Sequence, residues 1–377
     1  MECKVSYLNL IEKELQPSHS QNSKYSVIDL FAGCGGLALG FEAAGFKTIG
    51  YEILEDACAT YRYNLHSPCH QVNLTPLSIL ETKSVTSLQD VDYIIGGPPC
   101  QPFSVGGHQL GLKDSRDGFP TFISTVRRYR PQLALFENVR GMLFRNKVYF
   151  AEIVEALQEL DYIVEWQILN AADYGVPQKR ERLFCVAHKG GWKWPEKTHF
   201  TAPYTAGEAL GELAFSVPKN SKFLTPSMDD YVKKYEIASK CVKPRDVHLD
   251  KPCRTVTCRN LSGATGDMLR IRLPDGRRRR LTVREGARLQ SFPDWFEFQG
   301  SENSQFNQIG NAVPPLLAKA LARSVNAYLN SECQQPQKVR QSTRYTQLSL
   351  DFAIDFLENP VTKNRKLHQR GVATDAE

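Results

Sequence analysis

Residues 25–44 read YSVIDLFAGCGGLALGFEAA, and this stretch sets the fold class of the chain. Tyr25–Phe31 is a mostly apolar run with the length of a buried strand. A glycine-rich turn follows, and the apolar residues of 37–44 have the spacing of a helix. A strand, a glycine turn and a helix in this order let a ligand approach the backbone closely at the start of the helix.

A second strand, predicted at residues 47–53, carries Glu52 at its carboxyl end. A carboxylate in that position is well placed to accept both hydroxyl groups of a ribose. The glycines are spaced G-x-G-G rather than G-x-G-x-x-G, so a ligand containing a nucleoside is favoured over a dinucleotide. A glycine turn that only packs a helix on a sheet explains the same residues equally well, and both interpretations stay open at this point.

Strand and helix patterns alternate over residues 25–188. This alternation predicts an α/β fold with a doubly wound, mostly parallel, Rossmann-like sheet. Residues 190–275 have no sustained helical period, which predicts a smaller, irregular second domain. The expected division is a loose N-terminal arm at 1–24, a catalytic domain at 25–189, the second domain at 190–300, a helix returning to the first domain at 301–330 and a peripheral tail at 331–377.

The chain has 377 residues with 47 basic and 41 acidic side chains, a formal net charge of +6. This mild excess is compatible with a polyanionic partner without requiring one. No apolar run is long enough to span a membrane and no signal peptide pattern is present, so we expect a cytoplasmic protein, and a monomer. The ten cysteines are expected to be reduced thiols, and their spacing predicts no metal site.

Chemistry is expected at residues 96–104, which read GGPPCQPFS. A short strand at residues 92–95 ends at the glycines, and the two prolines then fix a stiff path that puts Cys100 at the carboxyl edge of the sheet. A buried structural thiol is the plain alternative for any cysteine. The Gly-Gly-Pro-Pro frame and the polar Gln101 and Ser104 favour a nucleophile.

A carboxylate and two arginines are predicted at other strand ends: Glu137 follows a strand at 133–136, and Arg180 and Arg182 precede one at 183–187. Positive neighbours lower the pKa of a thiol from its ordinary value of about 8.5. These groups suit the addition of the thiol to C6 of a cytosine, with Glu137 protonating or hydrogen-bonding N3, so that C5 can attack a methyl group. The nucleoside-bearing ligand would be the methyl donor S-adenosylmethionine, and the base would first be flipped out of a duplex.

Six segments in order resemble the motif set of the DNA (cytosine-5) methyltransferases of prokaryotic restriction-modification systems, over about residues 25–328. They are DLFAGCGG at 29–36, PPCQ at 98–101, ENV at 137–139, QKRER at 178–182, REGARLQSFP at 284–293 and GNAVP at 310–314. Together they are very specific. The resemblance implies Cys100 as nucleophile, Glu137 as the N3 partner and Arg182 near the cytosine O2.

The same resemblance implies that residues 190–300 read DNA and that S-adenosylmethionine, leaving as S-adenosylhomocysteine, binds in the first domain. Asn73 stands where the family often has an acidic residue at the adenine amino group, and its amide oxygen can accept the same hydrogen bond. The basic run at 277–280 is better explained by phosphate binding than by a solvated turn. Arg180 is expected in the catalytic set with Cys100, Glu137 and Arg182, close to the backbone of the flipped nucleotide. The expected cofactor residues are Phe31, Ala32, Gly33, Gly35, Gly36, Glu52, Asn73, Pro99, Asn311 and Ala312, and the expected DNA contacts are Gln101, Ser104, Arg116, Gln178, Thr255, Arg259, Arg278 and Arg280.

The implied function is methylation of a specific site in double-stranded DNA, protecting host DNA from a cognate restriction endonuclease that is a genetic partner. Three alternatives are weaker. The branch that modifies transfer RNA usually has Cys-Phe-Thr and second-domain tyrosines, a pattern not seen here. A silent DNA-binding regulator would be expected to lack Cys100 or Glu137. A NAD-dependent oxidoreductase leaves the Pro-Pro-Cys-Gln segment and the arginines without a role.

Overall fold

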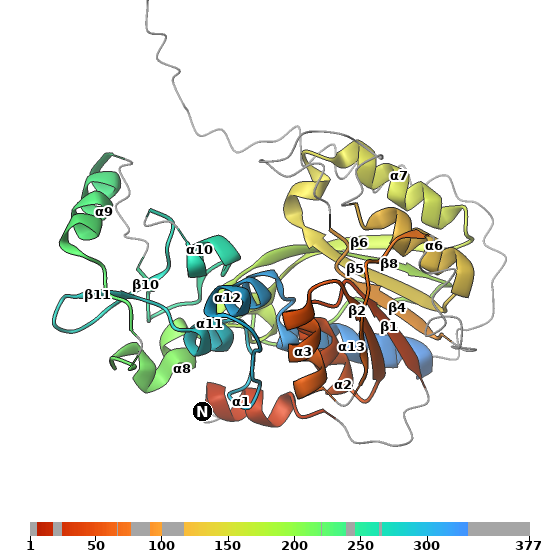
Figure 1. The fold of residues 1–377 in the computed structure, drawn as a ribbon. Helices are drawn as coiled ribbons and strands as arrows, with labels where there is room; N and C mark the ends of the chain where they lie inside the picture. The colour runs from red at the N-terminus through yellow and green to blue at the C-terminus, as the bar shows by residue number, and fades with distance from the viewer. Residues whose placement is uncertain are drawn as a thin grey trace, which may run out of the picture. The chain divides into compact units, whose positions relative to one another are not determined.

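A seven-stranded sheet, in the order β3-β2-β1-β4-β5-β8-β6, is the centre of the computed structural model (Figure 1). The structure describes residues 6–17, 25–65, 67–76, 91–99, 117–219, 221–238, 246–263 and 266–330. β8 runs antiparallel to both β5 and β6, whereas the pairs from β3 through β5 are parallel. The strands are β1 Ser26–Leu30, β2 Lys47–Glu52, β3 Cys69–Gln71, β4 Tyr93–Gly96, β5 Leu133–Val139, β6 Ile163–Asn170 and β8 Glu181–His188.

Helices cover both faces of this sheet, because successive strand residues point to opposite sides. Val27 and Ile95 belong to one hydrophobic cluster with α2, α3 and α13, and Ile28 and Ile94 belong to the other with α6 and α7 (Figure 1). The predicted doubly wound, mostly parallel α/β fold is confirmed. These helices are α2 Gly36–Glu42, α3 Glu55–Asn64, α6 Phe119–Tyr129, α7 Lys147–Gln158 and α13 Pro315–Asn330.

The α13 helix returns to the sheet through a close crossing with α2. A Cβ atom on Gly40 would lie 2.4 Å from the Cβ atom of Ala318, so only glycine allows the two backbones to approach this far. Pro315 begins α13, where its missing N–H costs nothing. The predicted returning helix is therefore present, and it starts at the predicted prolines.

Shorter elements fill residues 206–311. They are α8 Ala206–Leu210, η5 Gly211–Ala214, α9 Pro226–Ala238, β9 Cys253–Arg254, α10 Cys258–Ser262, β10 Arg270–Arg272, β11 Arg278–Arg280, α11 Val283–Leu289 and α12 Glu302–Asn311. β10 and β11 form an antiparallel pair, and β9 pairs with the short strand β7 Gln178–Lys179. The division into domains at residues 189 and 300 stays a prediction.

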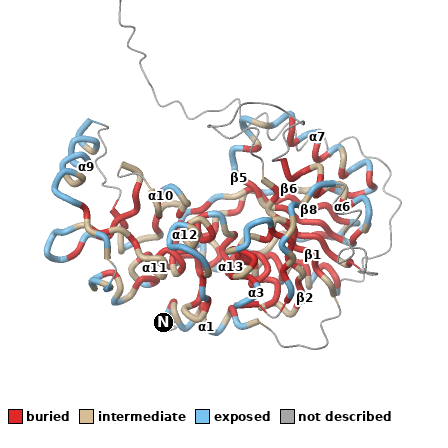
Figure 2. Tube along the Cα trace, viewed as in Figure 1, coloured by how far each residue is buried: buried red, intermediate tan, exposed pale blue. Residues whose placement is uncertain are grey.

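The region 190–275, which has no sustained helical period in its sequence, contains one helix of 13 residues, α9. This helix buries only Val232 within its own length, and Figure 2 shows most of it as exposed. A helix with so thin an apolar face has almost no hydrophobic period in its sequence, which is why the pattern did not reveal it. Gly310 lies inside α12, and the third strand of the chain is Cys69–Gln71.

The expected loose arm contains a helix, α1 Tyr7–Glu14. Tyr7, Ile11 and Leu15 are buried at a spacing of four, and the hydroxyl of Tyr7 donates to the carbonyl of Arg288 over 3.0 Å. This helix therefore packs into the core, contrary to the prediction. Within the described part of the chain, no helix is long and apolar enough to cross a membrane.

Candidate active site

Glu137 and Arg182 meet at the carboxyl end of β5, where the antiparallel strand β8 begins. The Nε atom of Arg182 lies 3.0 Å from Oε1 of Glu137, and the side chains are 14% and 12% exposed. Burial raises the pKa of Glu137, while the charges of Arg182 and Arg180 act in the opposite direction. Glu137 therefore keeps a proton to higher pH than an ordinary glutamate. The sequence placed Glu137 after the strand, whereas it lies within β5.

The backbone that leads to Cys100 is held beside this carboxylate. β4 and β5 are neighbours, and a Cβ atom on Gly97 would lie 3.9 Å from Oε2 of Glu137. The amide of Asn138 donates to the carbonyl of Pro98 over 3.0 Å, and the amide of Gly118 donates to the carbonyl of Pro99 over 3.0 Å. The path through the two prolines is thus anchored from two sides. Cys100, Gln101, Ser104 and Arg116 lie outside the described residues.

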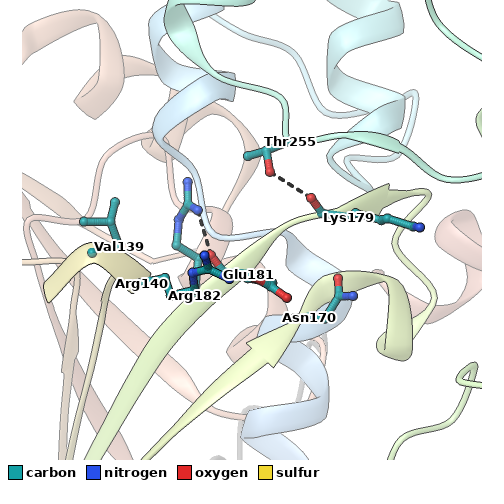
Figure 3. Close-up of a pocket in the computed structure, with 8 residues that line it drawn as sticks. Val139, Arg140, Asn170, Lys179, Glu181, Arg182 and Thr255 are labelled. Atoms are coloured by element: carbon teal, nitrogen blue, oxygen red, sulfur yellow. Dashed lines mark hydrogen bonds and ion pairs between the residues drawn. The ribbon is translucent and has the colours of Figure 1, made fainter. Parts of the chain in front are cut away.

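A cavity of about 440 Å³ opens at this edge of the sheet (Figure 3). The hydroxyl of Thr255 donates to the carbonyl of Lys179 over 2.8 Å, and Arg140 pairs with Glu181 over 2.6 Å. The wall is therefore rich in hydrogen-bonding groups, as a site for a polar planar ligand requires. It is lined by Val139, Arg140, Gly141, Asn170, Lys179, Glu181, Arg182 and Thr255.

Arg180 and Gln178 point into the protein rather than into the cavity. The guanidinium of Arg180 donates to the carbonyls of Val256 and Gly310 over 2.8 and 3.2 Å. Burial lowers its pKa to about 9, with a smaller contribution from Arg182 in the same direction. Gln178 donates to the carbonyl of Leu289 and accepts from the amide of Val256. The structure shows both side chains bonded to the backbone of residue 256, and their contact with a flipped nucleotide stays a prediction.

The predicted ribose acceptor Glu52 is already bound to the backbone of its own pocket. Its Oε2 accepts from the amide of Gly33 over 2.9 Å, and its Oε1 accepts from the amides of Ile53 and Leu54, both over 2.9 Å. Because a carboxylate has about four lone-pair sites, these three bonds leave room for about one ribose hydroxyl. The geometry does not support the expectation that Glu52 accepts both hydroxyls.

The glycine turn combines open space with tight packing. Phe31 and Gly33 have positive φ angles of 58° and 55°, and a Cβ atom on Gly33 would meet nothing within 4 Å. A Cβ atom on Gly36 would lie 2.5 Å from the carbonyl of Val313 and 3.1 Å from the side chain of Ala312. Gly33 therefore leaves a space that a ligand can enter, while Gly36 lets the 312–313 backbone close the same pocket.

The remaining predicted cofactor residues lie around this turn. Ala32 is buried, and the amide of Val72, next to the exposed Asn73, donates to the carbonyl of Glu52 over 2.8 Å. Gly35, with φ of 88°, sits against the ring of Tyr61, where a Cβ atom would clash. Asn311 is exposed and accepts from the thiol of Cys258 over 3.0 Å. These residues come from distant parts of the sequence, and the cofactor role of each stays a prediction.

The basic run at 277–280 mostly serves the interior of its own region. Arg278 lies 3.1 Å from carboxylate oxygens of both Asp229 and Asp246, and Arg279 is fully buried against Glu285 at 2.6 Å. Arg280 donates to the carbonyl of Leu261 over 3.2 Å. Since the charge of Arg278 is matched by carboxylates, the structure gives it an internal role in place of the expected phosphate contact. The prediction of DNA contact remains for Arg280 and for the exposed Arg259, whose Nε lies 3.8 Å from Asp267.

Several site residues were missed by the sequence reasoning. Asn138 holds the proline path, and Arg140, Asn170, Lys179 and Glu181 line the cavity. Asn138 stands inside the ENV segment, so its position next to Glu137 was a usable signal. Lys179 and Glu181 likewise stand inside the QKRER segment, whereas Arg140 and Asn170 have no such signal and are brought together by the pairing of β5 and β6 with β8.

Comparisons with known proteins agree with this geometry. The family model for C-5 cytosine-specific DNA methylase matches residues 25–327. Type II methyltransferase M.AplI of Arthrospira platensis is 58% identical over 340 residues, covering 89% of this chain and 95% of that protein. Type II methyltransferase M1.HphI of Haemophilus parahaemolyticus is 38% identical over 323 residues, covering 79% and 86%.

The solved structure of the Dnmt2 methyltransferase of S. pombe has the same fold, with a TM-score of 0.63 at 16% identity, covering 81% of this chain and 99% of that chain. At this identity the likeness speaks for the fold alone. The family model matches most of the chain. The alignments with the two relatives cover most of the length of each relative. The chain belongs to the C-5 cytosine-specific DNA methylase family.

Proposed function

We propose that this chain transfers a methyl group from S-adenosylmethionine to C5 of a cytosine flipped out of double-stranded DNA, through a covalent bond between Cys100 and C6. The observation that carries this proposal is the buried carboxyl group of Glu137, paired with Arg182 and lying next to Gly97, three residues before Cys100. A protonated carboxyl group beside an arginine suits the N3 and O2 edge of a cytosine.

The residues around the glycine turn fit S-adenosylmethionine. The space at Gly33 accepts a ligand close to the backbone, and Glu52 retains an acceptor site for a ribose hydroxyl. Ile53 and Leu54 are exposed apolar side chains that follow Glu52 directly, as a surface for an adenine ring requires. When bound, the cofactor supplies an electrophilic methyl group and leaves as S-adenosylhomocysteine.

Three side chains of the protein have different roles in the reaction. Glu137 donates its proton to N3 while Arg182 hydrogen-bonds O2, so the ring accepts electrons from the thiolate of Cys100 at C6. The pair of electrons displaced to C5 takes the methyl group. A base then removes the C5 proton, the bond between sulfur and C6 breaks, and the N3 proton returns to Glu137. Pro98 and Pro99, anchored by Asn138 and Gly118, aim the thiol.

The biological role that fits best is protection of host DNA in a restriction-modification system, with a cognate endonuclease encoded alongside. The relatives M.AplI and M1.HphI carry the name Type II methyltransferase, which supports this setting. Bisulfite sequencing of DNA from cells that express the protein tests both target and context. We expect one cytosine within one short sequence to be protected from conversion.

A matched assay separates DNA from RNA as substrate. Purified wild type and Cys100→Ser are incubated with radiolabelled S-adenosylmethionine and either duplex DNA or transfer RNA. We expect label in DNA from the wild type alone, while both proteins bind the cofactor. Duplex DNA carrying 5-fluorocytosine should trap a covalent adduct with the wild type. Label in transfer RNA and none in DNA would overturn the proposal in favour of an RNA enzyme.

A further inference from the structure

Residues 139–148, VRGMLFRNKV, form a basic and apolar segment at the rim of the cavity. The segment runs from the end of β5 through η3 (Arg140–Leu143) to the first residues of α7. It contains three basic side chains, Arg140, Arg145 and Lys147, and no acidic one. Its charge is therefore of one sign.

The segment also exposes apolar side chains. Val139, Phe144 and Val148 are 51%, 37% and 67% exposed. Large apolar residues that gather on a surface mark interaction sites more often than scattered ones do. Because the segment combines exposed apolar groups with positive charge, the favoured binding partner is a polyanion that also has apolar parts.

The backbone of the segment is held by hydrogen bonds and by a buried side chain. Met142 is buried beneath it, and the amides of Phe144 and Arg145 both donate to the carbonyl of Gly141, over 3.1 and 2.9 Å. The guanidinium of Arg140 lies over the ring of Phe144, 5.7 Å from its centre. A fixed backbone that presents these groups outward loses little entropy when a partner binds.

The position of the segment identifies the partner. Val139, Arg140 and Gly141 line the same cavity as Arg182, the partner of Glu137 (Figure 3), so a nucleotide bound at Arg182 would lie beside this segment. Arg140 is already paired with Glu181, whereas Arg145 and Lys147 are exposed a few residues further on. The backbone of DNA combines phosphates with apolar sugar faces, which matches both kinds of side chain.

We propose that residues 139–148 are a DNA-backbone contact of the catalytic domain, in which Arg145 and Lys147 bind phosphates and Phe144 and Val148 pack against the sugars. This inference rests on the proposed function, since it assumes that DNA is the substrate. It assigns to the catalytic domain a sequence-independent part of DNA binding, separate from the residues that read the bases.

The double substitution Arg145→Ala/Lys147→Ala tests this contact. Binding of duplex DNA is measured by fluorescence anisotropy between ~50 and ~200 mM salt. Because each phosphate contact contributes about 0.9 to the slope of log K against log salt, the slope should fall by about 1.8 in magnitude. Affinity should fall by a similar factor for DNA with and without the target site, and cofactor affinity should stay unchanged. Phe144→Ala should weaken binding without changing the slope.

A matched control removes two cations at the opposite edge of the sheet. Lys47 begins β2 and Arg127 lies near the end of α6, and both are exposed. Lys47→Ala/Arg127→Ala should leave the slope at its wild-type value. An unchanged slope in the 145/147 variant would overturn the inference, as would an equal fall in the control. If the wild type itself does not methylate DNA, the proposed function fails instead.

Discussion

The side-chain amide of Asn138 donates a hydrogen bond of 3.0 Å to the backbone carbonyl of Pro98. Its Oδ1 accepts from the amide of Val139 over 2.8 Å, so the side chain is bonded at both ends while buried. Asn138 directly follows Glu137 on β5. One strand therefore supplies the proton donor of the proposed reaction and also ties down the backbone that leads to the proposed nucleophile.

Asn138→Ala should slow methyl transfer more than its effect on folding explains. Loss of a buried hydrogen-bonding partner costs about 1–3 kcal/mol of stability, and the proline path loses one of its two anchors. Asn326→Ala is a control for the loss of a hydrogen-bonding amide, because the half-buried Asn326 of α13 donates to the carbonyl of Ala44 over 2.9 Å. Unfolding curves should show a loss of stability in both variants, the larger for the buried Asn138, and single-turnover rates should fall for Asn138→Ala alone. Equal rates in the two variants would contradict this role.

Glu137→Gln should change the pH dependence of the rate. Burial raises the pKa of Glu137, so the protonated donor persists above the usual range of a glutamate and is lost as pH rises through the folded-state pKa. The rate of the wild type should fall over that range. The glutamine variant cannot transfer a proton, so it should be slower by about 10²–10⁴-fold and should lack this fall. If the rate of the variant falls at the same pH, the fall in the wild type is caused by a group other than Glu137.

The same ionisation should affect stability. A carboxyl group whose pKa is raised on folding contributes stability that is present at low pH and is lost as pH rises through the folded-state pKa. The difference in unfolding free energy between Glu137→Gln and the wild type should therefore shift in favour of the variant as pH rises. Chemical denaturation at several pH values measures this difference in unfolding free energy. A difference that does not change with pH would contradict the burial of an ionisable group at this position.

Arg180→Ala and Arg182→Ala should fail in different ways. Arg180 is buried and bonds the carbonyls of Val256 and Gly310, so its loss leaves two buried acceptors unpaired at about 1–3 kcal/mol each. Arg182 lines the cavity and pairs with Glu137, so its loss should reduce the rate by about 10²–10³-fold and should cost less stability than the loss of Arg180, because Glu137 can take up a proton when its partner is removed. Thermal unfolding and turnover under saturating cofactor separate the two effects. Equal loss of stability in both variants would contradict the assignment.

Gly33→Ala and Gly36→Ala should separate cofactor binding from packing. A Cβ atom at Gly33 meets no protein atom within 4 Å, so the cost to folding is the strain of a positive φ, about 1–2 kcal/mol, while the ligand space is reduced. At Gly36 the Cβ atom would lie 2.5 Å from the carbonyl of Val313, so the backbone itself must move. Isothermal titration with S-adenosylmethionine should show weak binding by a folded Gly33→Ala. The melting temperature should drop more for Gly36→Ala than for Gly33→Ala. A larger drop for Gly33→Ala would contradict the geometry of the glycine turn.

Local sequence patterns predicted the sheet and suggested the chemistry. The central strands β1, β4 and β5 are buried along most of their length and read as apolar runs, so the alternation of strands and helices predicted the doubly wound fold. The residue types of Cys100, Glu137 and Arg182 and their places next to predicted strands led to the proposed reaction. A helix that buries few of its own residues, such as α9, has no clear apolar period in its sequence and was not predicted.

Side-chain direction and partners required the tertiary structure. Gln178, Arg180 and Arg182 lie within five residues of each other in the QKRER segment, yet the first two are buried and only Arg182 faces Glu137. The arginines of residues 277–280 looked like one basic surface, but Arg278 pairs with Asp229 and Asp246, which are distant in sequence, and Arg279 pairs with the nearby Glu285. The sequence alone determined which groups are present and which strand carries each. The fold decided which charges are paired and which are free for a substrate, because pairing depends on residues brought together across tens or hundreds of positions.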